Sequence, residues 1–180
     1  MIIHGVQNCK HYFKEQPRVI RKATVKDIPD ILDLLKLRIQ WMDDMGLYQW
    51  NKTDYLGVYP HSYFEFRVEQ DDLYVAVDYG QTVGVMALLR DDPRWPTPAK
   101  ALYVHHLATH PDYRGLGVTM LSFAEQETLQ MGGNVLRLDC QTVNLALNRY
   151  YENLGYVHAG TCVDGAYEGN LMEKHLSEGE

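Results

Sequence analysis

Apolar and polar residues alternate along several short segments of this chain, as expected for strands that bury one face in a sheet. Two of these segments, residues 73–77 and 82–89, are joined by Asp78-Tyr79-Gly80-Gln81, where the glycine favours a tight hairpin turn. The predicted strands are residues 18–23, 73–77, 82–89, 101–109, 135–140, 156–162 and 169–175.

Between the strands, apolar residues recur three or four positions apart, which predicts amphipathic helices. Gly132-Gly133 and Gly155 follow two of these stripes as stop signals. The predicted helices are residues 27–39, 62–69, 116–131 and 144–154. The aromatic-rich stretch 38–59 gives no clear pattern. The predicted order is β-α-α-β-β-β-α-β-α-β-β, an α/β (α+β) domain over residues 18–177, with residues 1–17 as an N-terminal extension.

Composition narrows the functional classes. The formal net charge of −7 argues against nucleic acid as the main partner, because phosphate contacts require a surplus of basic residues. No apolar run approaches the roughly 18 residues of a membrane span and no leader segment is recognisable, so we expect a cytoplasmic protein without a membrane partner. Cys9, Cys140 and Cys162 form no C-x-x-C pair, which predicts free thiols.

The most informative segment is residues 107–119, a predicted strand that leads through a short glycine-containing loop into a helix. Gly115 and Gly117 permit unusual backbone conformations, and the first N–H groups of a helix can converge on an anion. Such a site uses backbone donors with Arg114 as the one added cation, so it suits a diphosphate even in an acidic protein. Neither a P-loop nor a Rossmann motif is present.

This segment resembles the [Gln/Arg]-x-x-Gly-x-[Gly/Ala] signature of the GNAT superfamily of N-acetyltransferases. Arg114, Gly117 and Thr119 occupy its three defined positions. Thr119 departs from the pattern, because glycine or alanine is usual there. Its side chain can either crowd a bound pyrophosphate or add a hydrogen bond through its hydroxyl.

A second segment resembles the superfamily's Asn-x(6)-Tyr-x-x-x-Gly-[Phe/Tyr] element, with Asn144, Tyr151 and Gly155-Tyr156 at the defined positions. The two motifs together extend the resemblance over about residues 18–175. It implies a GNAT fold, whose central mixed and mostly antiparallel sheet is splayed between strands 4 and 5 and flanked by helices. Those strands correspond to residues 101–109 and 135–140.

The resemblance also implies acetyl-CoA as the acetyl donor, with its pantetheine arm in the splay and without a metal ion. The implied cofactor-binding residues are Leu107, Ala108, Thr109, Arg114, Gly115, Leu116, Gly117, Val118, Thr119 and Asn144. The Leu107 N–H is expected to polarise the thioester carbonyl. Tyr151 is expected to protonate the departing CoA thiolate, although packing alone is the alternative for this residue.

His105 is the candidate general base, because it resembles a histidine that some arylalkylamine acetyltransferases place in this strand. Strand alternation puts His105 on the same face as Leu107 and puts His106 on the other face. A purely structural role remains the alternative. His105, His106 and His110 do not predict a metal site, because adjacent residues face opposite ways and no carboxylate or cysteine completes a ligand set.

Trp41, Tyr48 and Trp50 are expected to line the acceptor pocket, because the corresponding region does so in relatives, and core packing is the alternative. The expected reaction is direct attack on the thioester by the primary amine of a small molecule. Acetylation of a protein N-terminus or lysine is a second hypothesis, and a non-catalytic acetyl-CoA-binding sensor is a third. A homodimer is compatible with the sequence but not specified by it.

Overall fold

A computed structural model describes residues 18–165 and 167–177, and the expected N-terminal extension, residues 1–17, lies outside them. The described strands form one sheet in the order β1-β2-β3-β4-β5-β7-β6. They are β1 (Val19–Lys22), β2 (Leu73–Asp78), β3 (Gln81–Leu89), β4 (Ala101–Thr109), β5 (Val135–Gln141), β6 (Val157–Asp164) and β7 (Tyr167–His175). Neighbouring strands are antiparallel except β4 and β5, which are parallel. The predicted α/β (α+β) class and mostly antiparallel sheet are therefore confirmed.

The helices are α1 (Ile28–Asp44), α2 (Tyr55–Val58), α3 (His61–Glu69), α4 (Leu116–Gln130) and α5 (Leu145–Asn153), with 3₁₀ turns at Val25–Asp27 and Trp50–Lys52. The single-turn α2 lies in the aromatic stretch that showed no clear periodicity. Helix α1 starts one residue after the predicted start, because the Asp27 carboxylate accepts the Thr24 N–H at 2.7 Å in the preceding turn. In the described part of the chain, no helix is both long and apolar enough to cross a membrane.

The hairpin between β2 and β3 has the predicted turn. Tyr79 and Gly80 have φ angles of 47° and 81°, so both central residues are left-handed, as a type I′ turn requires. The last two strands are longer than predicted, because their ladder continues to Asp164 opposite Tyr167. Polar residues and glycines in this region obscure the alternation on which the prediction depended.

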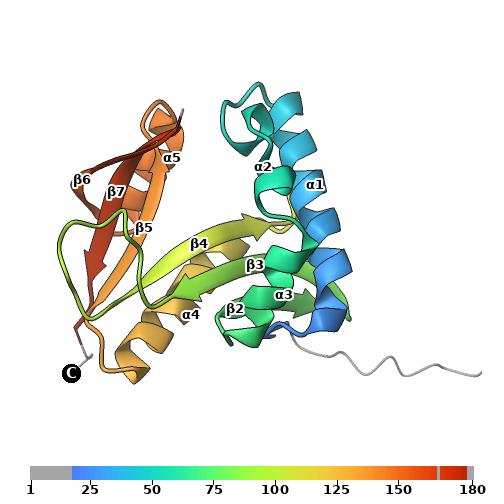
Figure 1. The fold of residues 1–180 in the computed structure, drawn as a ribbon, viewed down its shortest axis with the longest axis horizontal. Helices are drawn as coiled ribbons and strands as arrows, with labels where there is room; N and C mark the ends of the chain where they lie inside the picture. Colours follow the sequence, from blue (N-terminus) through green and yellow to red (C-terminus); the bar gives the residue numbers. More distant parts are fainter. Residues whose placement is uncertain (1–17, 166, 178–180) are drawn as a thin grey trace, which may run out of the picture.

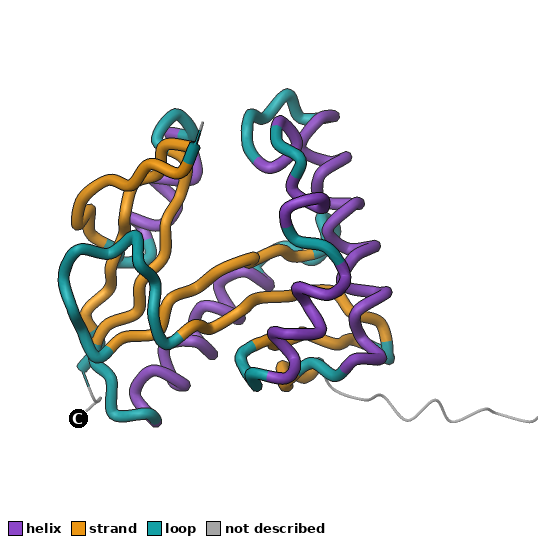
Figure 2. Tube along the Cα trace, viewed as in Figure 1, coloured by secondary structure: helices purple, strands orange, loops and turns teal. Residues whose placement is uncertain are grey.

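Helices cover both faces of the sheet (Figure 1). On one face, α1 and α3 bury Leu35 and Phe64 in a core shared with β2 and β3. On the other face, α4 and α5 contribute Met120 and Tyr151 to a second core. Residues 90–100 form a long loop that folds across β5 and β7, where Trp95 joins a third buried cluster (Figure 2). This loop carries charged residues to the point where the sheet opens.

Candidate active site

The sheet opens where β4 and β5 separate. Their ladder begins with Ala101 opposite Val135 and ends with Val104 opposite Leu138, although β4 continues to Thr109. Figure 1 shows the two strands diverging beyond this point. The predicted splay between strands 4 and 5 is therefore confirmed. Past Val104, the edge of β4 that faces β5 has backbone groups that this ladder does not use.

Leu107, Ala108 and Thr109 lie on this open stretch of β4. On the opposite edge, β4 still pairs with β3, where Ala108 faces Val85 and Thr109 faces Gly84. One edge is therefore fixed within the sheet while the other is open. Such an edge can accept an extended ligand as an additional strand, so the structure brings these predicted residues to a suitable place.

Helix α4 begins at the glycine turn that the sequence singled out. Gly115 is its N-cap, with a left-handed backbone at φ 80° and ψ −10°. A Cβ at this position would meet no atom within 4 Å, so glycine is needed for its backbone conformation rather than for space. The Leu116 N–H donates to the Tyr113 carbonyl at 3.2 Å, and the Leu116 side chain is buried. The turn is thus fixed before any ligand binds.

Two backbone donors are free at this helix start. Among the described residues, the N–H groups of Gly117 and Val118 donate to no carbonyl before the helix, whereas the Thr119 N–H donates to the Gly115 carbonyl at 3.2 Å. The Thr119 hydroxyl lies 3.5 Å from the same carbonyl oxygen, so it is directed to the first turn of its own helix. The exposed Arg114 side chain lies beside the free donors in sequence. Together they form a candidate anion site.

Strand β4 contains a bulge at His106, which has a φ of 55°. Two residues of β4, His106 and Leu107, lie opposite Met86 alone. The extra residue interrupts the alternation of side chains, so His105 and His106 lie on the same side with ring centroids 6.0 Å apart. Leu107 instead packs against the core beneath α4. The prediction that His105 and Leu107 share a face opposite His106 is therefore wrong.

His105 belongs to a charged network at the fork between β4 and β5. Its Nε2 lies 3.1 Å from Asp92 Oδ2, and the Arg94 guanidinium contacts the same carboxylate at 2.8 Å. Arg94 also reaches Asp139 Oδ1 on β5 at 2.9 Å, so it links the first unpaired positions of the two strands. In the described chain, no group of three or more His, Cys, Asp or Glu side chains is arranged to hold a metal ion.

The network also keeps the Asp92 carboxylate ionised. Burial would raise the pKa of Asp92, but hydrogen bonds from His105 and Arg94 outweigh it and hold this pKa well below its usual range. The Asp92 carboxylate can accept a hydrogen bond from His105 Nε2, and the Arg94 guanidinium lies 3.2 Å from Nε2 and 3.3 Å from Nδ1 of the same ring. The carboxylate and the guanidinium together fix the orientation of the His105 ring.

His106 is enclosed by tyrosines from α2 and α3. Its Nδ1 lies 2.5 Å from the Tyr55 hydroxyl and its Nε2 lies 2.7 Å from the Tyr63 hydroxyl. Burial, assisted by the nearby positive charges of Arg67 and Arg94 and by His105, lowers the pKa of His106 to about 3. The ring is therefore neutral at physiological pH and too weak a base to remove a proton from an ammonium group.

Helix α5 contributes the predicted Asn144 and Tyr151. Asn144 caps the helix, because its Oδ1 accepts the Leu147 N–H at 3.0 Å. Tyr151 is buried, and burial raises the pKa of its phenol, so the hydroxyl stays protonated at neutral pH. The neighbouring Tyr150 hydroxyl lies 3.3 Å from the position that a Cβ on Gly117 would occupy. Helix α5 thus contacts the first turn of α4, and Tyr150 is a contact that the sequence reasoning missed.

Trp41, Tyr48 and Trp50, which were predicted to line the acceptor pocket, do not lie together in the structure. Trp50 stacks on Tyr55 with ring centroids 4.7 Å apart, so it joins the aromatic rings around His106. Trp41 is covered by the Arg38 guanidinium, 3.9 Å from its ring centroid, and Tyr48 is 61% exposed. Among the described residues, no ring contact joins Trp41 or Tyr48 to Trp50.

The sequence contains a signal for the tyrosines around His106 that the predictions above did not use. Tyr55, Tyr59 and Tyr63 are four positions apart, which is the spacing of one helical face. Pro60 separates them into α2 and α3, yet all three rings still contact His106, at centroid distances of 5.9, 4.5 and 5.2 Å. Tyrosines spaced four residues apart can therefore all contact one residue, even where a proline interrupts the helix between them.

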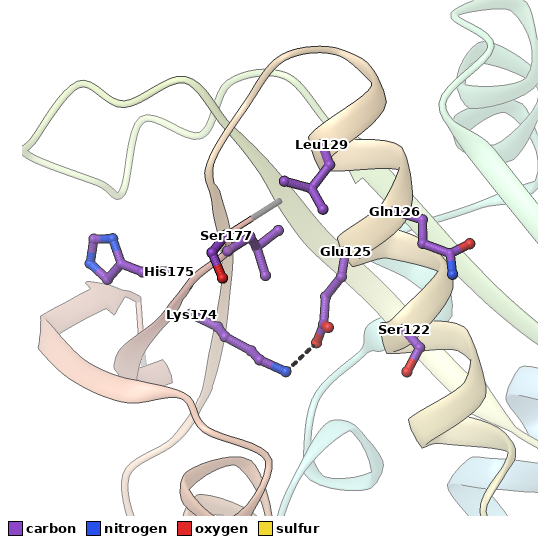
Figure 3. Close-up of a pocket in the computed structure, with 8 residues that line it drawn as sticks. Ser122, Glu125, Gln126, Leu129, Lys174, His175 and Ser177 are labelled. Carbon is purple, nitrogen blue, oxygen red and sulfur yellow. Dashed lines mark hydrogen bonds and ion pairs between the residues drawn. The ribbon is translucent and has the colours of Figure 1, made fainter. Parts of the chain in front are cut away.

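A surface depression of about 310 Å³ lies away from these features, between the second half of α4 and the end of β7 (Figure 3). Lys174 and Glu125 form an ion pair of 2.7 Å beside it. None of the residues that line it belongs to the start of α4, to the fork between β4 and β5 or to the aromatic rings around His106. The depression is therefore not part of the candidate active site.

The chain matches known proteins over most of its length. Residues 44–156, more than half of the chain, match the Acetyltransferase (GNAT) family. Over 164 residues the chain is 26% identical to the uncharacterized N-acetyltransferase YesJ of Bacillus subtilis (strain 168), which covers 86% of this chain and 88% of that protein. The match to the family includes the start of α4 and the fork between β4 and β5.

Solved structures show the same fold. A GNAT-family acetyltransferase from Listeria monocytogenes 4b F2365 has a TM-score of 0.72 and 25% identity, and covers 88% of this chain and 95% of its own. The PaiA N-acetyltransferase of Thermoplasma acidophilum, in complex with coenzyme A, has a TM-score of 0.72 and 19% identity, and covers 89% and 100%. The family match and the shared geometry lead to one conclusion: the chain belongs to the Acetyltransferase (GNAT) family and is an enzyme of the N-acetyltransferase type.

Proposed function

We propose that this enzyme transfers the acetyl group of acetyl-CoA to the primary amine of a small molecule. The observation that carries the proposal is the open edge of β4 beside the free N–H groups at the start of α4. Acetyl-CoA combines an extended pantetheine arm with a diphosphate, and these two features suit its two parts. The PaiA enzyme, which shares the fold, was solved in complex with coenzyme A, and this supports the same cofactor here.

The donor would lie along β4 with its diphosphate at α4. Residues 107–109 would pair with the pantetheine arm, and the Leu107 N–H would stabilise the negative charge that develops on the thioester oxygen. The N–H groups of Gly117 and Val118 would hold the diphosphate, with Arg114 as an added cation. Residues 115–119 then act mainly through the shape of the turn, and Asn144 acts by fixing the start of α5.

Two side chains would handle protons. His105 would take the proton of the acceptor ammonium, while Asp92 stabilises the imidazolium that forms. The neutral amine would attack the thioester carbonyl carbon, and the carbon–sulfur bond would break as the amide forms. The nitrogen of the new amide would release its surplus proton to solvent. Tyr151 would give its phenolic proton to the CoA thiolate, and the phenolate would recover a proton from solvent. The products are the N-acetylated amine and free CoA.

A small amine is favoured by the aromatic rings near the fork. Trp50 and Tyr55 stack on each other, and Tyr59 lies against His106. Aromatic ring faces attract ammonium groups and provide apolar contact for a compact acceptor. Two carboxylates at the same fork, those of Asp92 and Asp139, share a single guanidinium, that of Arg94, which leaves a surplus of negative charge to attract an ammonium group.

The proposal is tested by release of free thiol from acetyl-CoA with a panel of arylalkylamines, diamines, polyamines and amino acids, together with peptides that carry a free N-terminus or a lysine. We expect at least one small amine to react faster than either peptide. Turnover of the peptides alone would replace the proposal with a protein acetyltransferase. Binding of acetyl-CoA without turnover of any acceptor would instead indicate a sensor module.

A further inference from the structure

We infer that His106 is a positioning residue. Held between the hydroxyls of Tyr55 and Tyr63, it fixes the β4 bulge in the conformation that directs the Leu107 N–H. The inference rests on the proposed function, because that function assigns the Leu107 N–H to the thioester carbonyl. Through His106, helices α2 and α3 would support the peptide unit whose N–H binds the thioester carbonyl of acetyl-CoA.

The backbone of His106 needs support from its surroundings. A non-glycine residue at a φ of 55° is strained, because its Cβ approaches the neighbouring carbonyl. Such a conformation persists only where surrounding contacts hold it. The conformation of His106 also sets the direction of the peptide unit that carries the Leu107 N–H. Loss of the support would therefore move that donor.

The hydrogen bonds to the ring supply this support. A neutral imidazole has one donor and one acceptor nitrogen, and each lies within 2.7 Å of one tyrosine hydroxyl. The Tyr55 and His106 side chains are both only 7% exposed, so water does not compete strongly for these bonds. The ring is also packed against Phe64 of α3, with centroids 5.9 Å apart. Its position is therefore determined by α2 and α3 together.

The location explains why β4 needs this support. The ladder between β4 and β5 ends at Val104, two residues before His106, so β5 cannot hold β4 at the bulge. Helices α2 and α3 replace the lost strand contact through the side chain of His106. Because both ring nitrogens are occupied by tyrosines, His106 acts on Leu107 through the backbone and not on a substrate directly.

The experiment compares the wild-type protein with the double variant Tyr55→Phe/Tyr63→Phe. Protein labelled with ¹⁵N-leucine reports the Leu107 amide signal, which is assigned with Leu107→Ile. We expect acetyl-CoA to shift this signal in the wild type, and the shift to be largely lost in the double variant. We also expect kcat with the best amine of the panel to fall on the order of 10- to 100-fold, with little change in KM for acetyl-CoA.

Tyr74→Phe is the matched control. Tyr74 is also buried, and its hydroxyl donates to Glu127 Oε2 at 3.2 Å in the core beneath α4. The substitution removes the same chemical group at a comparable folding cost, but it should leave both kcat and the Leu107 shift unchanged. If the double variant does not fold, the milder Tyr63→Phe, in which one hydrogen bond to the ring remains, takes its place.

A rescue series separates backbone strain from anchoring. Glycine adopts positive φ without strain, so His106→Gly keeps the bulge accessible but removes the anchor, and we expect a lowered kcat. His106→Asn tolerates positive φ and can bond to one tyrosine, so it should be intermediate. A wild-type Leu107 shift and kcat in the double variant would overturn the inference and leave the proposed function intact. A wild-type protein that does not respond to acetyl-CoA would instead remove the proposed function.

Discussion

Replacement of Tyr151 with phenylalanine is expected to lower kcat about 100-fold while the affinity for acetyl-CoA stays nearly unchanged. The ring remains to pack in the core beneath α4 and α5, but the proton for the CoA thiolate is lost. Because burial raises the pKa of Tyr151 above its ordinary value, the acid stays protonated as pH rises. The kcat of the wild type should therefore not fall between pH 7 and 9. Steady-state thiol release and calorimetric titration measure the two parts of the prediction.

Tyr156→Phe provides the control for this variant. Its ring lies 5.7 Å from that of Tyr151, and its buried hydroxyl has no hydrogen-bond partner among the described residues. Removal of this hydroxyl costs no hydrogen bond, so both stability and kcat should be retained. If Tyr151→Phe retained the kcat of Tyr156→Phe, the proton donor would have to be another group.

Replacement of Gly115 with alanine is expected to weaken acetyl-CoA binding at least tenfold. The φ of 80° at this N-cap is unfavourable for alanine by roughly 1 to 2 kcal/mol, so the turn should relax and displace the free N–H groups of Gly117 and Val118. Those two groups are the donors proposed for the diphosphate. Isothermal titration with acetyl-CoA measures the change.

Gly80→Ala is the matched control, because Gly80 resembles Gly115 in its backbone conformation and in the free space around an added Cβ. Gly80 has a φ of 81° and, like Gly115, no atom within 4 Å of an added Cβ. It lies in the hairpin turn between β2 and β3, whereas Gly115 is the N-cap of α4. Both variants should lose similar thermal stability, but only Gly115→Ala should lose affinity. Equal affinities in the two variants would contradict the role given to the turn.

The sequence was sufficient for most of the fold because its patterns are local. Strands with strong alternation, such as residues 101–109, and helices followed by Gly132 or Gly155 were located to within a residue or two. The turn at the start of α4 was also recognisable, because a left-handed N-cap at Gly115 demands a glycine that is visible in the sequence. A backbone conformation that requires a particular residue type can therefore be predicted from the sequence.

No residue in the sequence indicates the bulge in β4. His106 occupies a positive φ where a glycine would have signalled an irregularity, so simple alternation placed His105, His106 and Leu107 on the wrong faces. The bulge is held by tyrosines from α2 and α3, and such a long-range contact cannot be read from the strand alone.

The charged network at the fork could not be predicted from the sequence either. Asp92 and Arg94 lie in a loop rich in proline, and Asp139 lies in a strand far along the chain. Only the fold brings Arg94 within 2.9 Å of Asp139 at the point where the strands separate. The aromatic residues predicted for the acceptor pocket were also not separable from the sequence. Trp50 joins the rings around His106, whereas Tyr48 is largely exposed. Residues that act through tertiary contacts require the structure.

The central claim is that the free N–H groups at the start of α4 and the open edge of β4 hold acetyl-CoA. A crystal structure of the enzyme with acetyl-CoA tests it most directly. The diphosphate is expected within hydrogen-bond distance of the Gly117 and Val118 N–H groups, with the pantetheine arm beside residues 107–109. Acetyl-CoA bound in the depression near Lys174, or β4 and β5 paired beyond Val104 with no cofactor between them, would contradict the account.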